Sequence, residues 1–279
     1  MVFGILVVYS ENYFADALIE FHKILKLTSS QYKLIVVINN TVLAEKYKTF
    51  PVQHIKFQVV FGFNIFHEFS GWQEGLDFIK NNHADLYNES GYMFANDTLC
   101  KHRKYTPLHP LLFAICSYSV LISSKPKMAG QCLSESEEID FNDVRFNIFI
   151  ATYFFTLNRQ AIKLMDYKVM PTQELINQYL VGGHCEESFF TEKLSMVLKN
   201  RQLNILFNGL WYKSEKLNQN NKEFLYCKAR SNLAEMYLSS KAHSNGIELI
   251  DTYLIIKLIN KVINKIPLFR ESISYLRKQ

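Results

Sequence analysis

Short apolar runs alternate with stretches of helical spacing through the N-terminal third of the chain, and this alternation restricts the fold more than any other feature. The runs at residues 3–9, 32–38, 54–61 and 92–95 are rich in β-branched and aromatic residues, which predicts buried strands. Residues 14–27 carry apolar side chains at helical spacing. Strands separated by helices are typical of βαβ units. We therefore expect an α/β fold with a mainly parallel sheet flanked by helices.

The pattern continues with less regularity towards the C-terminus. The segment 133–143 is acidic and is expected to be a mobile loop. The polar run 217–222 predicts a boundary between a domain over 1–216 and a helical extension over 217–279. Helices are expected at 42–47, 72–79, 107–122, 159–165, 172–180, 186–199 and 247–265, and strands at 127–132, 152–157 and 203–207.

Composition narrows the function classes. The net charge of +5 is mild and no arginine-rich block occurs, so nucleic-acid binding is not expected. The five cysteines are odd in number and widely spaced, which favours a reducing compartment over a disulfide framework or zinc site. No run of about 18 apolar residues predicts a membrane span. We expect a cytoplasmic protein.

Lys257, Lys261 and Lys265 form a basic stripe, typical of a docked terminal helix or of a peripheral contact with anionic lipid on the inner face of the cytoplasmic membrane.

Polar residues follow the predicted strands at the edge where parallel sheets bind ligands. Asn96-Asp97-Thr98 follows the fourth strand, and its carboxylate is a candidate ligand group; an Asx-turn or helix cap is the alternative. Tyr9 and Ser10 stand at the end of the first strand. Asn39 and Asn40 follow the second, so these pairs are candidates for holding a nucleotide base and its ribose, or for forming turns.

One segment and its neighbours carry a family resemblance. Phe69, Gly71, Trp72 and Gly75 open a predicted helix before the strand that ends in Asn96-Asp97-Thr98. This order resembles the nucleotide-sugar half of GT-A glycosyltransferases. It is similar in particular to bacterial cell-surface polysaccharide transferases of the rhamnan-synthesis protein F type. The resemblance covers roughly residues 3 to 200 and implies a GT-A-like, that is Rossmann-like, sheet.

The resemblance implies a nucleotide-sugar donor site. Asp97 is expected at the donor diphosphate and as a ligand of Mg²⁺ or Mn²⁺, although Ala95 stands where the usual acid-x-acid pair has its first acid. Trp72 is either a wall of the sugar pocket or a core residue. The basic run 101–104, which includes Arg103, is expected either to compensate the diphosphate charge or to be a solvated loop.

An acid pair supplies the candidate base. By resemblance to inverting glycan synthases, Glu187 is the base and Glu186 its neighbour; acids in a first helical turn also complement the helix dipole without catalysis. Glu235 and His184 are further candidates.

We therefore expect an inverting glycosyltransferase that acts on a cell-surface glycan (lipopolysaccharide, O-antigen or capsule) or its lipid-linked precursor. One alternative is a nucleotidyl- or phosphosugar transferase, for which Ser10-Glu11-Asn12-Tyr13 supplies no glycine-rich phosphate loop. The other is a non-catalytic partner that binds sugar nucleotides, which the incomplete acid pair favours.

Overall fold

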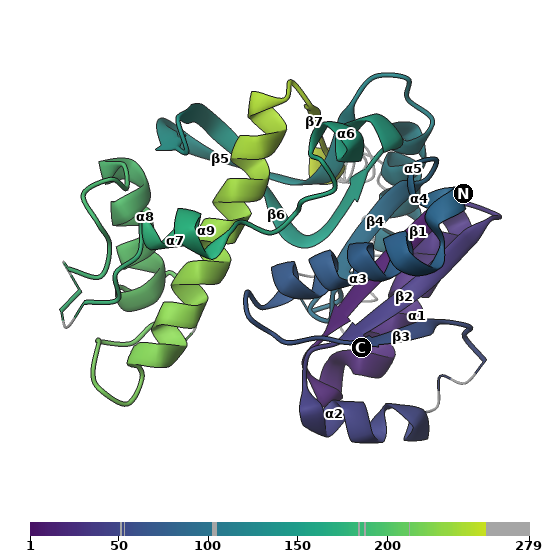
Figure 1. Cartoon of the computed structure of the whole chain (residues 1–279), viewed down its shortest axis with the longest axis horizontal. Helices are drawn as coiled ribbons and strands as arrows, with labels where there is room; N and C mark the ends of the chain where they lie inside the picture. Colours follow the sequence, from purple (N-terminus) through teal and green to yellow (C-terminus); the bar gives the residue numbers. More distant parts are fainter. Residues whose placement is uncertain are drawn as a thin grey trace, which may run out of the picture.

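A computed structural model of the chain describes residues 1–50, 52, 54–101, 105–183, 185–186, 188–211 and 213–254. The described part contains a seven-stranded sheet of order β3-β2-β1-β4-β6-β5-β7 (Figure 1). Its strands are β1 (Val2–Val8), β2 (Tyr32–Ile38), β3 (Gln58–Phe61), β4 (Gly91–Asn96), β5 (Lys127–Phe141), β6 (Val144–Leu157) and β7 (Glu248–Asp251). Strand β6 runs antiparallel to its neighbours β4 and β5, and the other pairings are parallel. The predicted α/β fold with a mainly parallel sheet is confirmed.

Helices cover both faces of this sheet. They are α1 (Glu11–Thr28), α2 (Thr41–Lys46), α3 (Glu68–Asn82), α4 (Ala84–Tyr87), α5 (His109–Leu121), α6 (Arg159–Leu164), α7 (Gln173–Asn177), α8 (Met196–Phe207) and α9 (Lys222–Ser244). Successive residues of a strand point to opposite faces. Accordingly Leu6 and Val8 of β1 join a core with α1 and α5, whereas Ile5 and Val7 join the core with α3 and α9.

The glycines of α3 explain how closely this helix packs on the sheet. A Cβ atom at Gly71 would lie 2.8 Å from the methyl carbons of Val7, and one at Gly75 would lie 2.6 Å from Ile5 Cγ2. Contacts this short are incompatible with a larger residue unless the helix moves away from β1. The glycine pattern around Trp72 therefore has a packing reason that is independent of any ligand.

The predicted mobile loop at 133–143 is wrong, because β5 extends to Phe141 and forms a long hairpin with β6. Asn142 and Asp143 form its turn with φ values of 55° and 59°. Two successive left-handed residues are typical of the tight turns that match strand twist. The side chains of Ile139 and Phe141 point into the core while the acidic residues remain largely at the surface. The alternation of apolar and acidic residues before the Asn142-Asp143 turn was the sequence signal of a strand.

Three further predictions from the C-terminal half are wrong. Residues 203–207 belong to helix α8 and not to a strand, and the helix expected over 186–199 begins only at Met196. The chain beyond 217 is not all-helical, since β7 pairs with β5 and falls within the helix expected over 247–265. The lysine stripe of that expected helix lies outside the described residues.

Helix α9 crosses the sheet beside β6, and α7 and α8 lie beyond it, far from β3 (Figure 1). The backbone N–H of Ile150 in β6 donates a hydrogen bond to Ser239 Oγ of α9 at 3.2 Å. Buried residues of α9 share one core with β1 and α3. The domain boundary at 217 stays a prediction, while α9 and β7 pack as parts of the same core and sheet. Among the described residues, no helix is long and apolar enough to span a membrane.

Candidate functional site

A small cavity of about 140 Å³ lies at the carboxyl edge of the parallel strands. The ends of β1, β2 and β4 contribute to it, together with the connection from β3 to α3. Its lining residues are Val7, Tyr9, Asn39, Asn64, His67, Glu68, Asn96, Asp97 and Thr98. The structure thus brings together four of the predicted donor-site residues, from three strand ends far apart in the sequence. This edge of an open parallel sheet is where ligands bind.

Asp97 joins two of these strand ends. Its Oδ2 accepts hydrogen bonds from the backbone N–H groups of Tyr9 at 2.8 Å and Ser10 at 2.5 Å. The residue is buried, and burial raises the pKa of its carboxyl group although the two N–H donors favour the charged form. The side chain therefore ties the β1–α1 junction to the end of β4, which is a structural role at a ligand-binding edge.

Asn96 forms the local turn that the sequence offered as an alternative. Its Oδ1 accepts hydrogen bonds from the backbone N–H of Thr98 at 3.1 Å and from Thr98 Oγ1 at 2.6 Å. This Asx-turn directs the chain away from β4 and leaves Asp97 facing the β1–α1 junction. The amide oxygen of Asn96 is thus already engaged within the protein.

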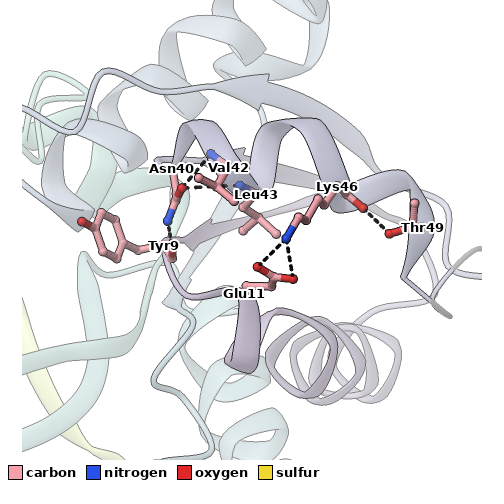
Figure 2. A network of polar contacts seen from close by, with 7 residues as sticks. All are labelled: Tyr9, Glu11, Asn40, Val42, Leu43, Lys46 and Thr49. Carbon is pink, nitrogen blue, oxygen red and sulfur yellow. Dashed lines mark hydrogen bonds and ion pairs between the residues drawn. The ribbon is translucent and has the colours of Figure 1, made fainter.

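The junctions after β1 and β2 are tied together by a polar network (Figure 2). Asn40 Nδ2 donates to the carbonyl oxygen of Tyr9 at 2.9 Å, and Asn40 Oδ1 caps α2 by accepting from Val42 N at 2.9 Å. Lys46 and Glu11 form an ion pair at 3.4 Å beside it. The Tyr9 ring points away from this network and is 54% exposed (Figure 2). Asn40 therefore holds the backbone, while the Tyr9 ring is open to a ligand.

The β3–α3 connection supplies cavity residues that the sequence analysis missed. Asn64 and His67 have φ values of 52° and 50°, which side-chain-bearing residues rarely adopt. Asn64 Oδ1 and His67 Nε2 are buried and have no hydrogen-bond partner among the described residues. Asn39 Nδ2 donates to the carbonyl oxygen of His67 at 2.9 Å and holds this connection against β2. Unpartnered buried polar atoms in a strained segment are typical of ligand sites.

The electrostatic surroundings of His67 favour a neutral ring. Burial lowers the pKa of His67; the neighbouring Glu68 opposes this effect, and Lys228 and Arg230 of α9 add to it. A neutral imidazole can donate through one nitrogen and accept through the other. His67 can therefore act as a hydrogen-bond partner or as a proton acceptor for a group in the cavity.

Helix α9 approaches the same edge with Ser231 and Glu235. Ser231 Oγ lies 3.5 Å from Glu68 Oε1. Glu235 Oε2 accepts hydrogen bonds from Thr152 Oγ1 at 2.9 Å and from Thr152 N at 3.3 Å. Burial raises the pKa of Glu235; the hydrogen bond from Thr152 and the charge of Lys228 oppose this effect, and the charge of Glu68 adds to it. Glu235, one of the candidate bases, is thus fastened to β6 by its carboxyl group.

Trp72 is a core residue and not a wall of the cavity. Its side chain is fully buried, and its Nε1 donates to the carbonyl oxygen of Ala95 at 3.0 Å. Its ring packs edge-on against Phe94 and Phe155. Of the two roles expected for Trp72, the core residue is confirmed and the wall of the sugar pocket is wrong, because no surface of the ring is open to a ligand.

Glu186 lies away from the cavity. It occupies an irregular segment, so the predicted acid pair does not open a helix. Its carboxylate accepts from Leu217 N at 3.4 Å and lies 3.8 Å from Lys216 Nζ. Glu187, His184 and Arg103 lie outside the described residues, and their roles stay predictions.

The basic run after β4 is described at Lys101. Its Nζ lies 2.9 Å from Asp16 Oδ2 on α1, so this lysine is paired away from the cavity. No group of three or more His, Cys, Asp or Glu side chains in the described part is placed to hold a metal ion. The Mg²⁺ or Mn²⁺ expected at Asp97 stays a prediction.

Comparisons with known proteins leave the family open. No family model matches the chain. No curated protein matches it either. Among solved structures, the chain is similar to the 4-diphosphocytidyl-2C-methyl-D-erythritol synthase of Anaerococcus prevotii, with 13% identity over 82% of this chain and 97% of that chain and a TM-score of 0.39. A likeness this distant carries no argument about activity. The resemblance to GT-A glycosyltransferases stays a prediction.

Proposed function

We propose that the protein is a transferase that binds a nucleotide-activated sugar at the carboxyl edge of β1, β2 and β4. The observation that carries this proposal is the cavity in which buried Asn64 Oδ1 and His67 Nε2 lack a partner beside Asp97. Ligand pockets typically measure about 300–1,000 Å³, so a cavity of about 140 Å³ suits one polar group of a larger ligand. The remainder of the nucleotide sugar would extend over the exposed ring of Tyr9.

Glycosyl transfer is the reaction we favour. The bond from the anomeric carbon to the diphosphate oxygen breaks, an acceptor hydroxyl oxygen bonds to that carbon, and its proton passes to a base while the diphosphate leaves. Glu187 is the base proposed from the resemblance. The neutral ring of His67 is a proton acceptor beside the cavity, and Lys228 and Arg230 place positive charge near it. The acceptor in this proposal is a cell-surface glycan or its lipid-linked precursor, at the inner face of the membrane.

A nucleotidyl- or phosphosugar transferase remains the second candidate. The solved structure named above carries a name of this class, at a TM-score that gives it no weight. The β1–α1 junction bears on this candidate directly. Its backbone N–H groups at Tyr9 and Ser10 already bind the Asp97 carboxylate, so they are not free to hold a phosphate. This candidate therefore requires that the phosphate bind at another part of the cavity.

One set of assays separates these functions. The purified protein is mixed with nucleotide sugars, or with nucleoside triphosphates and sugar phosphates, with and without Mn²⁺, and unfolding temperature and products are measured. Release of nucleoside diphosphate supports glycosyl transfer, and release of pyrophosphate supports nucleotidyl transfer. A rise in unfolding temperature with no product from any mixture supports a non-catalytic binding partner. No shift and no product would contradict all three.

Variants of the cavity test where the ligand binds. His67→Ala and Glu68→Gln remove cavity groups and are expected to weaken nucleotide-sugar binding about tenfold or more, the loss of one hydrogen bond to a charged group. Glu11→Gln is the matched control, because Glu11 is exposed near the same junction but does not line the cavity (Figure 2). Equal affinity in all three variants would place the ligand elsewhere.

A further inference from the structure

A second and larger cavity lies at the opposite, amino-terminal edge of the sheet, where β2 and β3 begin. Its volume is about 660 Å³, within the range of pockets for small molecules. The start of β2, the segment leading into β3, and the ends of α1 and α3 form its walls. The lining residues are His22, Lys26, Tyr32, Lys33, Leu34, His54, Lys56, Phe57, Gln58 and His83. Three lysines and three histidines thus face one cavity, and none of the described residues that line it is acidic.

The lysines of this amino-edge cavity are not paired with acidic side chains in the described part of the chain. Lys26, Lys33 and Lys56 form no ion pair with any carboxylate of the described residues. The carbonyl ends of α1 and α3 face this edge and each contribute about half a negative charge. Two half charges leave most of the charge of three lysines uncompensated. Concentrated like charge opposes folding, so an anion bound here would stabilise the protein.

Hydrogen bonds hold one of the lysines in place. Lys33 Nζ lies 3.1 Å from His83 Nδ1, and His83 Nε2 lies 2.8 Å from Gln58 Oε1. An ammonium group only donates, so Nδ1 accepts and Nε2 donates to the amide oxygen. The imidazole of His83 is therefore neutral. Burial and then Lys33 lower its pKa, and Asp85 acts in the opposite direction. Lys33 is thus oriented before any ligand arrives.

The histidine of α1 responds to the same charges. His22 Nε2 lies 2.7 Å from the Tyr32 hydroxyl group. Burial lowers the pKa of His22, and the neighbouring Lys26 and His54 lower it further. An anion bound among these groups would offset the positive charge that Lys26 and His54 place near His22, and would favour protonation of His22. Binding that draws in a proton gains affinity as the pH falls.

We propose that the amino-edge cavity binds a small anion that bears phosphate groups. Phosphate oxygens accept several charge-assisted hydrogen bonds, which matches the three lysines that line the cavity together with His22 and His54. The apolar faces of Phe57 and Leu34 complete the walls, so the cavity also accommodates an organic part of the ligand. The phosphate can belong to a soluble compound or to a lipid headgroup. This inference does not rest on the proposed function, because the cavity lies at the other edge of the sheet.

The test uses the whole protein with inorganic pyrophosphate as the probe. Affinity is measured by titration calorimetry at constant ionic strength for the wild type, the double variant Lys26→Gln/Lys56→Gln, and Lys23→Gln. Both mutated lysines of the double variant are exposed at their positions, so folding should be retained. Lys23 is the matched control, since it lies on α1 but pairs with Glu20 at 4.0 Å and does not line the cavity. Co-sedimentation with phosphatidylcholine vesicles, with and without phosphatidic acid, is measured in parallel.

The expected result is that pyrophosphate binds the wild type and Lys23→Gln alike, and binds the double variant at least about tenfold more weakly. Binding to phosphatidic acid vesicles that the double variant alone loses, without pyrophosphate binding, also supports the site and assigns it to a lipid headgroup. Equal affinity of all three proteins for both probes, or binding of neither probe, overturns the proposal.

Discussion

Asp97 Oδ2 lies 2.5 Å from the backbone nitrogen of Ser10, a residue 87 positions earlier in the chain. This contact joins the end of β4 to the point where α1 begins. The N-terminus of a helix carries partial positive charge, which favours a carboxylate there. The acidic residue that the sequence marks as a ligand group is therefore also a clamp between the neighbouring strands β1 and β4.

Replacing Asp97 tests this clamp. Asp97→Ala leaves the backbone N–H groups of Tyr9 and Ser10 without their acceptor, and we expect a loss of about 3 kcal/mol in the free energy of unfolding. Asp97→Asn keeps an acceptor oxygen and is expected to lose about 1 kcal/mol. Urea-induced unfolding measures both. An Ala variant as stable as the wild type would show that the clamp contributes nothing.

Two substitutions of His67 are expected to differ in stability but to weaken ligand binding equally. Its φ of 50° and ψ of −128° are accessible to glycine without strain, whereas alanine keeps the strain of a Cβ atom. We expect His67→Gly to be more stable than His67→Ala by about 1 kcal/mol in chemical denaturation. Both variants lose the imidazole, so both should weaken nucleotide-sugar binding equally. An Ala variant as stable as the Gly variant would indicate that the backbone relaxes.

Trp72 is expected to affect stability alone. Trp72→Phe removes the hydrogen bond to Ala95 O and leaves a small void between α3 and the sheet. We expect a loss of about 2–3 kcal/mol in the free energy of unfolding, with unchanged affinity for nucleotide sugars. Denaturation and titration calorimetry on the same preparation give both values. Weakened binding of nucleotide sugars at unchanged stability would show that Trp72 contributes to the ligand site.

Glu235 predicts a pH dependence of stability. Its pKa in the folded protein lies above the ordinary value of 4.5, so the folded state holds the proton more tightly than the unfolded state. The stability from this group is fully present below about pH 4.5 and is lost as the pH rises through the folded-state pKa. Glu235→Gln keeps an acceptor for Thr152 without ionising.

The advantage of Glu235→Gln over the wild type should therefore grow as the pH rises from acid to neutral, by about 1.4 kcal/mol for each unit of pKa shift. Unfolding curves collected at several pH values measure this difference. Thr152→Val is a useful companion, because it removes the hydroxyl donor to Glu235 while leaving the carboxyl group able to titrate. A constant difference between Glu235→Gln and wild type at every pH would contradict the shifted pKa.

The parallel half of the sheet was predictable because β1, β2 and β4 are largely buried on both faces and each reads as one apolar run. The strand β2 begins and ends where the sequence placed it, at Tyr32 and Ile38. The hairpin of β5 and β6 was harder to predict, because its outer end is exposed on one face and its acids resemble a loop. Helix α8 was mistaken in part for a strand because a short apolar run has no period of its own.

The residues of the candidate site also fall into those that the sequence predicted and those that it did not. Tyr9, Asn39, Asn96 and Asp97 were predictable, since the carboxyl ends of parallel strands share one edge. His67 and Glu68 had no such signal, because they reach the cavity through a connection whose left-handed residues cannot be inferred from their type. Trp72 and Glu186 were placed wrongly for a related reason: a motif names residues but not the direction in which they point.

The sequence by itself determined the alternation of strands and helices, the mainly parallel sheet, and the edge at which Asp97 lies, because these follow from local periodicity and from chain topology. The tertiary structure alone decided that Asp97 clamps Tyr9 and Ser10, that Trp72 is enclosed in the core, and that three lysines and three histidines share a cavity at the opposite edge. These features depend on contacts between residues distant in the chain, whose geometry no local pattern records.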